Sequence, residues 1–285
     1  MTTYAYFPGC SLNGTSKEYG ASTLSLSRAL GIELEELDDW SCCGATSAHC
    51  AGKEVSEALA ARNVALAADT GRDLVVPCAA CYNRTRRAAQ AMEDRKTRER
   101  LSQIMGRTLG DPVHVLHLLE LFARPEVTEK LQAMVTRPLS GTKVAAYYGC
   151  LLLRPKDTGI DDPENPTIMD GLLRQCGVEP VEWYFKAECC GASLAIPQAS
   201  AVEHLVSRII TNARSWGAEM IVTACPLCQV NLETRQSTEP GTQPMPVLYF
   251  TQVLGLAVGI VPHDLCVPSR VADALTREAV TAGGE

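Results

Sequence analysis

The chain has 285 residues, enough for two domains of ordinary size that each bury their own core. Its net charge of −7, from 33 acidic and 26 basic residues, argues against a nucleic-acid binding surface. Its 13 cysteines are too few, at this length, for a disulfide-stapled miniprotein. We therefore expect a soluble protein in which the cysteines have a chemical use.

We expect no targeting or membrane-spanning segment in this sequence. It opens on Met1-Thr2-Thr3-Tyr4, without the charged and apolar regions of a signal peptide. The longest apolar stretch, Val247–Val261, is interrupted by Gln252 and is shorter than the roughly 20 residues that span a bilayer. These features predict a cytoplasmic location, a reducing compartment where clustered cysteines usually bind metals or carry redox chemistry.

The first part of the chain predicts alternating strands and helices. Hydrophobic patterning and stop signals place strands at 4–7, 32–37 and 73–76, a strand or the entry to a helix at 112–115, and helices at 15–30, 53–70, 82–105 and 116–122. Basic clusters at 84–87 and 95–100 lie in mixed-charge helical sequence. Such clusters are typical of solvated faces, with a docking patch for a partner as the alternative.

The second part repeats the first. The boundary falls at Pro138–Gly141, which predicts one domain at 1–139 and another, with a tail, at 140–285. Strands recur at 143–148, 178–185, 219–223 and 246–249. The repeats differ mainly at Arg154–Pro166, which lengthens one loop by seven residues. We therefore expect an α/β fold of two pseudo-symmetric duplicated domains, each with a small, mostly parallel sheet flanked by helices.

Ten cysteines fall into two similar sets. In each set a single cysteine is followed by an adjacent Cys-Cys-Gly and then by a Cys-x-x-Cys motif, with 34 residues between the last two. The first set is Cys10, Cys42, Cys43, Cys78 and Cys81, and the second is Cys150, Cys189, Cys190, Cys225 and Cys228. Each group follows a predicted strand, at the sheet edge where α/β proteins bind ligands.

Five thiolates close together repel one another unless a positively charged centre neutralises them. A zinc ion takes four ligands and leaves one cysteine over. An ordinary cubane cluster also takes four, usually from a compact motif that this sequence lacks. Adjacent Cys42 and Cys43 are poorly placed to bind one small ion together, because successive side chains diverge. The sets therefore indicate a larger metal–sulfur cluster.

At this point the chain resembles the cysteine-rich, or CCG, domain family, and its tandem duplication resembles the B subunit of heterodisulfide reductase. The resemblance runs from Tyr4 to about Ile260. It implies that each complete set of five cysteines holds a non-cubane 4Fe–4S cluster. It also implies two partners, a ferredoxin-like C subunit and a flavoprotein A subunit, since this chain has no flavin or nicotinamide fingerprint.

The function that this resemblance implies is two-electron reduction of a disulfide, or the reverse oxidation of a sulfur carrier, between two clusters. Cys43 and Cys190 would then face one cleft between the domains as catalytic ligands. Two alternatives stay open at this stage. One is an electron-transfer component of a different oxidoreductase or quinone-linked dehydrogenase, and the other is a zinc-binding interaction module.

Four further residues lie beside or outside the two sets. His49 follows the first cysteine pair and is a candidate proton donor to a leaving thiolate, or a histidine bonded to backbone at a helix start. Cys50 lies close enough in sequence to contact the site. Cys176 and Cys266 are expected to be small buried residues.

Overall fold

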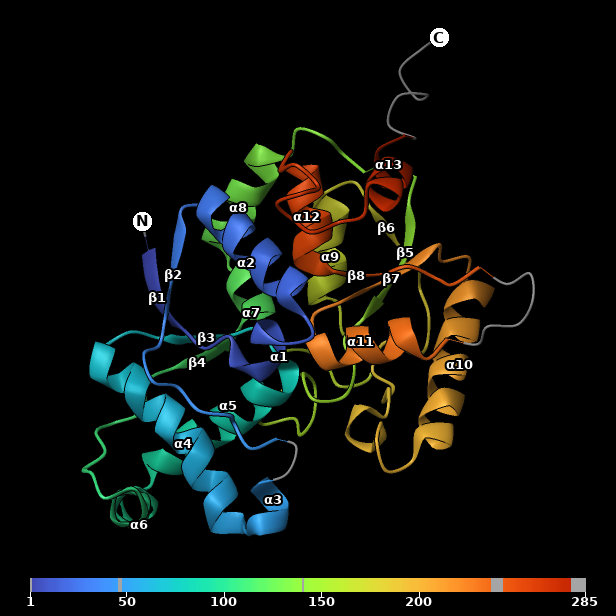
Figure 1. Cartoon of the computed structure of the whole chain (residues 1–285). Coiled ribbons are helices and arrows are strands. Elements are labelled where there is room, and N and C mark those ends of the chain that lie inside the picture. Colours follow the sequence, from blue (N-terminus) through green and yellow to red (C-terminus); the bar gives the residue numbers. More distant parts are fainter. Residues whose placement is uncertain (1, 46–47, 140, 237–242, 278–285) are drawn as a thin grey trace.

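The protein is described by a computed structural model, which covers all residues except 1, 46–47, 140, 237–242, 278–285 and the side chain of His49. Over these residues the chain forms two four-stranded parallel sheets with helices packed around them (Figure 1). The strand orders are β2-β1-β3-β4 and β6-β5-β7-β8. The repeated order confirms the predicted duplicated α/β fold with parallel sheets.

The first sheet and its helices lie within residues 2–134. The strands are β1 (Thr2–Tyr6), β2 (Ile32–Glu36), β3 (Leu74–Val76) and β4 (Val115–His117). The helices are α1 (Gly9–Asn13), α2 (Lys17–Ala29), α3 (Ala48–Ala51), α4 (Lys53–Thr70), α5 (Ala79–Glu93), α6 (Arg95–Met105), α7 (Leu118–Phe122) and α8 (Pro125–Met134).

The second sheet and its helices follow from residue 143. The strands are β5 (Lys143–Tyr147), β6 (Glu179–Pro180), β7 (Met220–Thr223) and β8 (Val247–Tyr249). The helices are α9 (Ile168–Gln175), η1 (Ala192–Leu194), α10 (Ala199–Ser215), α11 (Pro226–Thr234), α12 (Phe250–Ala257) and α13 (Ser269–Arg277). The boundary at 139/140 stays a prediction, and residue 140 lies outside the described residues.

The strand order creates a switch point in each sheet. In the first sheet, β1 pairs with β2 on one side and with β3 on the other, so the next two strands of the chain lie on opposite sides of β1. In the second, β5 pairs with β6 and β7 in the same way. The carboxyl ends of the strands on either side of such a point form a crevice that commonly binds ligands.

The two halves pack against each other through α2 and α12, which lie side by side in Figure 1. The Tyr19 ring stacks on the Tyr249 ring with centroids 4.1 Å apart and planes at 3°. The hydroxyls of Ser22 and Thr251 are 2.7 Å apart and buried. This contact combines apolar burial with a satisfied polar pair, so the halves form one continuous core.

The loop that the insertion lengthens also contacts the first half. The Asn83 side chain on α5 donates to the carbonyls of Leu151 and Arg154, at 3.2 and 3.0 Å. The Tyr82 hydroxyl donates to the Thr158 carbonyl at 3.0 Å. The insertion therefore packs on the helix that carries Cys81.

Several element boundaries differ from the sequence prediction. The helix predicted at 82–105 is two helices, because Asp94 leaves the helical conformation and its side chain accepts from the Thr97 amide at 2.8 Å as the N-cap of α6. The strand predicted at 178–185 pairs only at Glu179–Pro180. Pro180 is tolerated there because β6 is an edge strand, and the amides that donate to the carbonyls of Thr142 and Val144 are those of Glu179 and Val181.

Candidate metal centres

The first cysteine set gathers at the switch point of the first sheet. Cys10 follows β1 within α1, and Cys78 follows β3 as the N-cap of α5. Cys81 lies in the first turn of α5, and its sulfur is 3.1 Å from the Cys43 sulfur. Cys43, Cys78 and Cys81 are buried, whereas Cys10 and Cys42 are exposed. The set therefore has a buried side and a side open to solvent.

The second set repeats this arrangement on the second sheet. Cys225 follows β7 as the N-cap of α11, and Cys228 lies in the first turn of that helix. The sulfurs of Cys190 and Cys228 are 3.4 Å apart, and those of Cys150 and Cys189 are 3.8 Å apart. Cys189 is exposed and Cys150 is half-buried.

The glycine after each cysteine pair has a structural reason. Gly44 and Gly191 have φ of 77° and 76°, a conformation that favours glycine. In this conformation their amides point back to the first cysteine of the pair. The Gly44 amide donates to the Cys42 sulfur at 3.5 Å, and the Gly191 amide to the Cys189 sulfur at 3.3 Å. These amides would stabilise a negatively charged sulfur.

In two pairs of contacting thiols, Cys43 with Cys81 and Cys189 with Cys150, the pKa of one thiol is lowered and that of the other is raised. Hydrogen bonding to Cys81 lowers the pKa of Cys43 to about 7, and the contact with Cys43 raises the pKa of Cys81 well above its usual value. Hydrogen bonding to Cys150 lowers the pKa of Cys189 to about 6. In these two pairs one sulfur ionises more readily, and its negative charge opposes ionisation of the other. A cationic centre would allow both to bind as thiolates.

The two sets meet across the interface between the halves. Hydrogen bonding to Cys225 raises the pKa of Cys78, and the Cys78 contact in turn contributes to the lowered pKa of Cys225, after the contact with Cys228. With the contacts inside each Cys-x-x-Cys motif, the interacting thiols form one continuous series. Its members, all buried, are Cys43, Cys81, Cys78, Cys225, Cys228 and Cys190.

Two side chains that the sequence did not single out hold the backbone in front of Cys78 and Cys225. His117 accepts from the Leu119 amide through Nδ1, so its Nε2 donates to the Pro77 carbonyl, at 2.9 Å, just before Cys78. Burial lowers the pKa of His117 to about 4, so the ring stays neutral at pH 7. The Tyr19 hydroxyl donates to the Ala224 carbonyl, at 3.2 Å, just before Cys225. Neither residue belongs to a cysteine motif, so only the tertiary fold reveals them.

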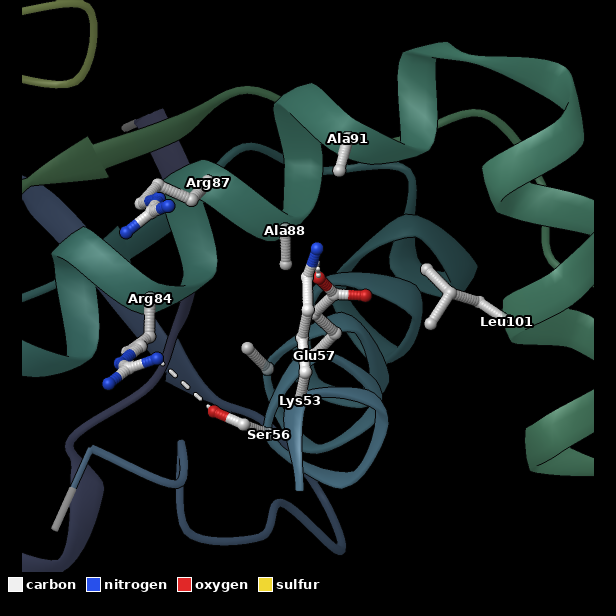
Figure 2. A pocket seen from close by; sticks show the side chains of 9 residues that line it. Lys53, Ser56, Glu57, Arg84, Arg87, Ala88, Ala91 and Leu101 are labelled. Carbon is white, nitrogen blue, oxygen red and sulfur yellow. Dashed lines mark hydrogen bonds and ion pairs between the residues drawn. The ribbon is translucent and has the colours of Figure 1, made fainter. Parts of the chain in front are cut away.

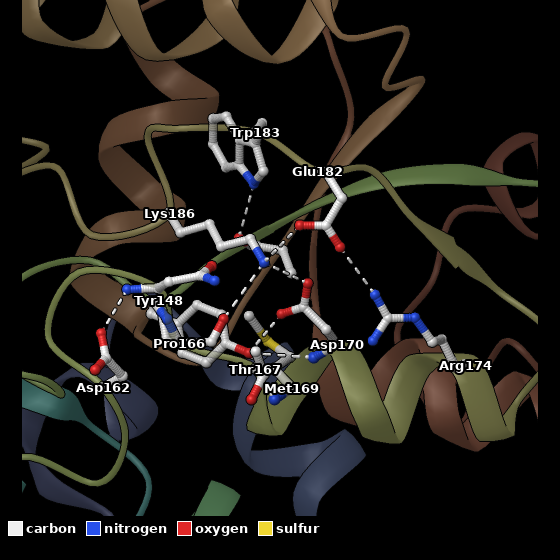
Figure 3. Close-up of polar contacts among 12 residues, drawn as sticks. Tyr148, Asp162, Pro166, Thr167, Met169, Asp170, Arg174, Glu182, Trp183 and Lys186 are labelled. Carbon is white, nitrogen blue, oxygen red and sulfur yellow. Dashed lines mark hydrogen bonds and ion pairs between the residues drawn. The ribbon is translucent and has the colours of Figure 1, made fainter.

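A buried polar network supports the second set alone (Figure 3). The Lys186 ammonium lies 2.8 Å from one Asp170 oxygen, and the Tyr148 hydroxyl donates to the other at 2.6 Å. The Lys186 carbonyl accepts from the amides of Tyr148 and Gly149, so the segment before Cys189 is tied to the segment before Cys150. By alignment of the cysteines, Pro8 and Asp39 occupy the positions of Tyr148 and Lys186 in the first repeat. The network is therefore a difference between the two centres.

The remaining sequence candidates have mixed outcomes. The His49 side chain lies outside the described part of the structure, so its proton-transfer role stays a prediction. Cys50 is exposed, and Cys176 is fully buried as predicted. The prediction for Cys266 is wrong. This residue is exposed and has φ of 51°, because it ends a turn in which its amide donates to the His263 carbonyl.

Two further kinds of site are absent from the described residues. In the described part of the chain, no group of three or more histidine, cysteine, aspartate or glutamate side chains is positioned to hold a single metal ion. None of the helices in the described ranges is both long enough and apolar enough to cross a membrane.

The repeated fold and the repeated cysteine sets define a protein of two cysteine-rich α/β domains. The family model for the cysteine-rich (CCG) domain matches residues 4–85 and again 144–233, and the chain belongs to this family. A protein of known structure from Helicobacter pylori, described as hypothetical, shares the fold with a TM-score of 0.72 at 13% identity. That match covers 93% of this chain and 51% of the Helicobacter chain.

Relatives of similar length belong to oxidoreductases. The chain is 34% identical to the "8-methylmenaquinol:fumarate reductase membrane anchor subunit" of Wolinella succinogenes, over 95% of this chain and 97% of the relative. It is 31% identical to the B subunit of the ferredoxin:CoB-CoM heterodisulfide reductase of Methanosarcina mazei, over 93% and 92%. A protein of Archaeoglobus profundus that is named as similar to the B subunit of heterodisulfide reductase is 30% identical. These relationships make the chain a homologue of oxidoreductase subunits.

Proposed function

We propose that each cysteine set holds one non-cubane 4Fe–4S cluster. The chemistry of the donors supports this assignment, because ten sulfurs gather in two groups and their mutual repulsion calls for a cationic centre. Amides of Gly44 and Gly191 already donate to sulfurs of Cys42 and Cys189. Such hydrogen bonds to sulfur are among the features that set the potentials of iron–sulfur sites.

We further propose that the protein is the iron–sulfur subunit of a heterodisulfide-reductase-like complex. The reaction is two-electron reduction of a disulfide, or the reverse sulfur oxidation. When bound, each cluster would supply one of the two electrons. The observation that supports this proposal most is the interaction of Cys78 with Cys225, two buried thiols that come from different sets.

The chain's own residues would bind and position the two centres. His117 and Tyr19 hold the backbone in front of the two Cys-x-x-Cys motifs, and Lys186 ties the outer loops of the second set. A ferredoxin-like C subunit and a flavoprotein A subunit are the proposed electron partners. The shared cleft at Cys43 and Cys190 and the cytoplasmic location stay predictions.

The Wolinella relative favours a second candidate function. Its name joins a methylmenaquinol to fumarate reduction, and it aligns with this chain over nearly its whole length. In that case the same two centres would transfer electrons from a quinol to a partner protein, without disulfide chemistry.

The metal content tests the cluster assignment. Anaerobically purified protein should contain iron and acid-labile sulfide in near-equal amounts, enough for both sets. Cys43→Ser and Cys190→Ser should each lose the cluster of one set, while Cys176→Ser, a buried cysteine outside both sets, should keep full iron. Stoichiometric zinc with little iron would contradict the assignment and favour the zinc module.

Activity of the reconstituted complex separates the two functions. We expect the complex to reduce disulfides. Cys43→Ser and Cys190→Ser should each abolish this activity. Quinol oxidation without disulfide turnover would support the second candidate instead. Full disulfide turnover by a Cys43→Ser protein that lacks its first cluster would rule out the two-cluster mechanism.

A further inference from the structure

A cavity of about 340 Å³ lies between α4, α5 and α6 on the first half of the molecule (Figure 2). Its inner wall is apolar and includes Ala60, Ala88 and Leu101, all of them buried. Basic side chains stand around it: Lys53 on α4, and Arg84 and Arg87 on α5. Its volume is at the small end of the range of about 300–1,000 Å³ that is usual for ligand pockets.

Two of the positive charges around the cavity have no carboxylate partner among the described residues. The carboxylate of Glu57 is already paired, with Arg100 at 2.7 Å and Lys53 at 3.7 Å. Among the described residues, no carboxylate forms an ion pair with Arg84 or Arg87. In a chain of net charge −7, two unpaired guanidinium groups beside one cavity indicate an anion site.

Arg84 is held in place at this cavity. Its Nη1 donates to the Ser56 hydroxyl at 3.2 Å, and Ser56 is only 5% exposed. Figure 2 shows this bond from α5 to α4, with the Arg87 guanidinium on the same side of the cavity. The guanidinium of Arg84 is therefore partly ordered before any ligand binds.

Comparison with the second repeat shows that the fold does not require an arginine here. Arg84 stands three residues after Cys81, and Asn231 stands three residues after Cys228. The Asn231 amide donates to the Cys190 carbonyl at 3.0 Å, which is a structural role in the second cysteine loop. The first repeat places a guanidinium at the same helical position and directs it to Ser56 beside the cavity.

The cavity also lies within electrostatic reach of the first cysteine set. Arg84 stands three residues after Cys81 on α5, one helical turn away, and the Cys81 sulfur is 3.1 Å from the Cys43 sulfur. A ligand that neutralises Arg84 would therefore change the electrostatic environment of Cys43.

We propose that this cavity binds an aliphatic carboxylate. The carboxylate pairs with Arg84 and Arg87, whose planar guanidinium groups can each donate two hydrogen bonds to it. The short aliphatic part packs on Ala60, Ala88 and Leu101, which disfavours a fully hydrated ion such as phosphate. The basic cluster at 84–87 could be a solvated face or a docking patch for a partner, and the cavity beside it favours a binding role. The same chemistry could come from a free acid or from a glutamate of another chain.

Calorimetric titration of the full-length protein tests the proposal. Hexanoate should bind, acetate should bind at least tenfold more weakly because it lacks the apolar part, and phosphate should bind more weakly still. Arg84→Gln should weaken hexanoate binding at least tenfold. Arg95→Gln, which removes an exposed arginine on α6 that pairs with Glu99, should leave it unchanged. Ala91→Leu narrows the cavity without altering its charge and should also weaken hexanoate binding.

An acetylated peptide with glutamate between two leucines separates the two sources. Tighter binding of the peptide than of hexanoate assigns the site to a protein partner, and the reverse assigns it to a small acid. Equal binding of acetate, phosphate and hexanoate, or no binding of any probe, overturns the proposal. These outcomes do not depend on the clusters. In cluster-loaded protein, hexanoate should in addition shift the spectrum of the centre that Cys43→Ser removes.

Discussion

Gly149, which immediately precedes Cys150, leaves little room for a side chain. It has φ of +69°, and a Cβ there would lie 3.1 Å from the Cys228 sulfur. Gly9 repeats this in the first half, with φ of +72° and 3.0 Å to the Cys81 sulfur. Glycine therefore lets two cysteines of one set approach each other across the switch point of each sheet.

Gly149→Ala should for this reason destabilise the second centre more than backbone strain alone requires. Alanine at positive φ costs about 1 kcal/mol or more, and the contact with Cys228 adds to this. Gly217→Ala is the matched control, because Gly217 has φ of +79° and no atom within 4 Å of its Cβ position. We expect Gly149→Ala to lower iron content by up to half, measured by iron and sulfide analysis. Equal iron content in the two variants would contradict this role of Gly149.

At the scale of elements, the second centre depends on contacts between α9 and two loops. Lys186 and Asp170 are 2% and 0% exposed, so their charges are removed from water. Buried ion pairs add little net stability, but a single buried charge left without its partner is costly. The pair is best understood as fixing the loops that carry Cys150 and Cys189.

Lys186→Met should therefore destabilise the protein by about 3–5 kcal/mol, because it leaves the Asp170 carboxylate buried and unpaired. Lys186→Met combined with Asp170→Asn should recover most of this loss, since asparagine keeps an oxygen for the Tyr148 hydroxyl. Glu182→Gln is the control, because Glu182 is exposed and lies 3.9 Å from Lys186. Chemical denaturation measures these differences. A double variant no more stable than Lys186→Met would contradict the charge-pair explanation.

For the whole molecule, the interface at α2 and α12 decides how the two cysteine sets are placed. Tyr19 contributes to it twice, by stacking on Tyr249 and by its hydrogen bond to Ala224. The side chain is fully buried. Removing it would disturb both the packing of the halves and the backbone in front of Cys225.

Tyr19→Ala should destabilise the protein by roughly 3–5 kcal/mol, as is usual for truncating a buried aromatic side chain. Differential scanning calorimetry should show the halves unfolding in separate steps, because the shared core is weakened. Tyr184→Ala is the control, since Tyr184 is 78% exposed and contacts Trp216 on the surface. A single unfolding transition at an unchanged temperature in Tyr19→Ala would show that the interface does not depend on this residue.

The sequence by itself determined the duplicated α/β fold and the two sets of five cysteines, because the motif spacing and strand patterning are local and repeated. It could not predict that the helix expected at 82–105 breaks at Asp94, because this depends on whether Asp94 caps a new helix or continues the previous one. It placed Cys266 in the core because free cysteines are usually small buried residues, whereas its turn exposes it.

Only the tertiary structure decided which residues support the sets and how the sets meet. His117, Tyr19 and Lys186 act across long sequence separations, through hydrogen bonds that no local pattern encodes. The approach of Cys78 to Cys225 likewise depends on the packing of two halves that are separate in sequence. Local periodicity specifies each half because its interactions are short in sequence, but relative placement depends on side-chain packing that forms only in three dimensions.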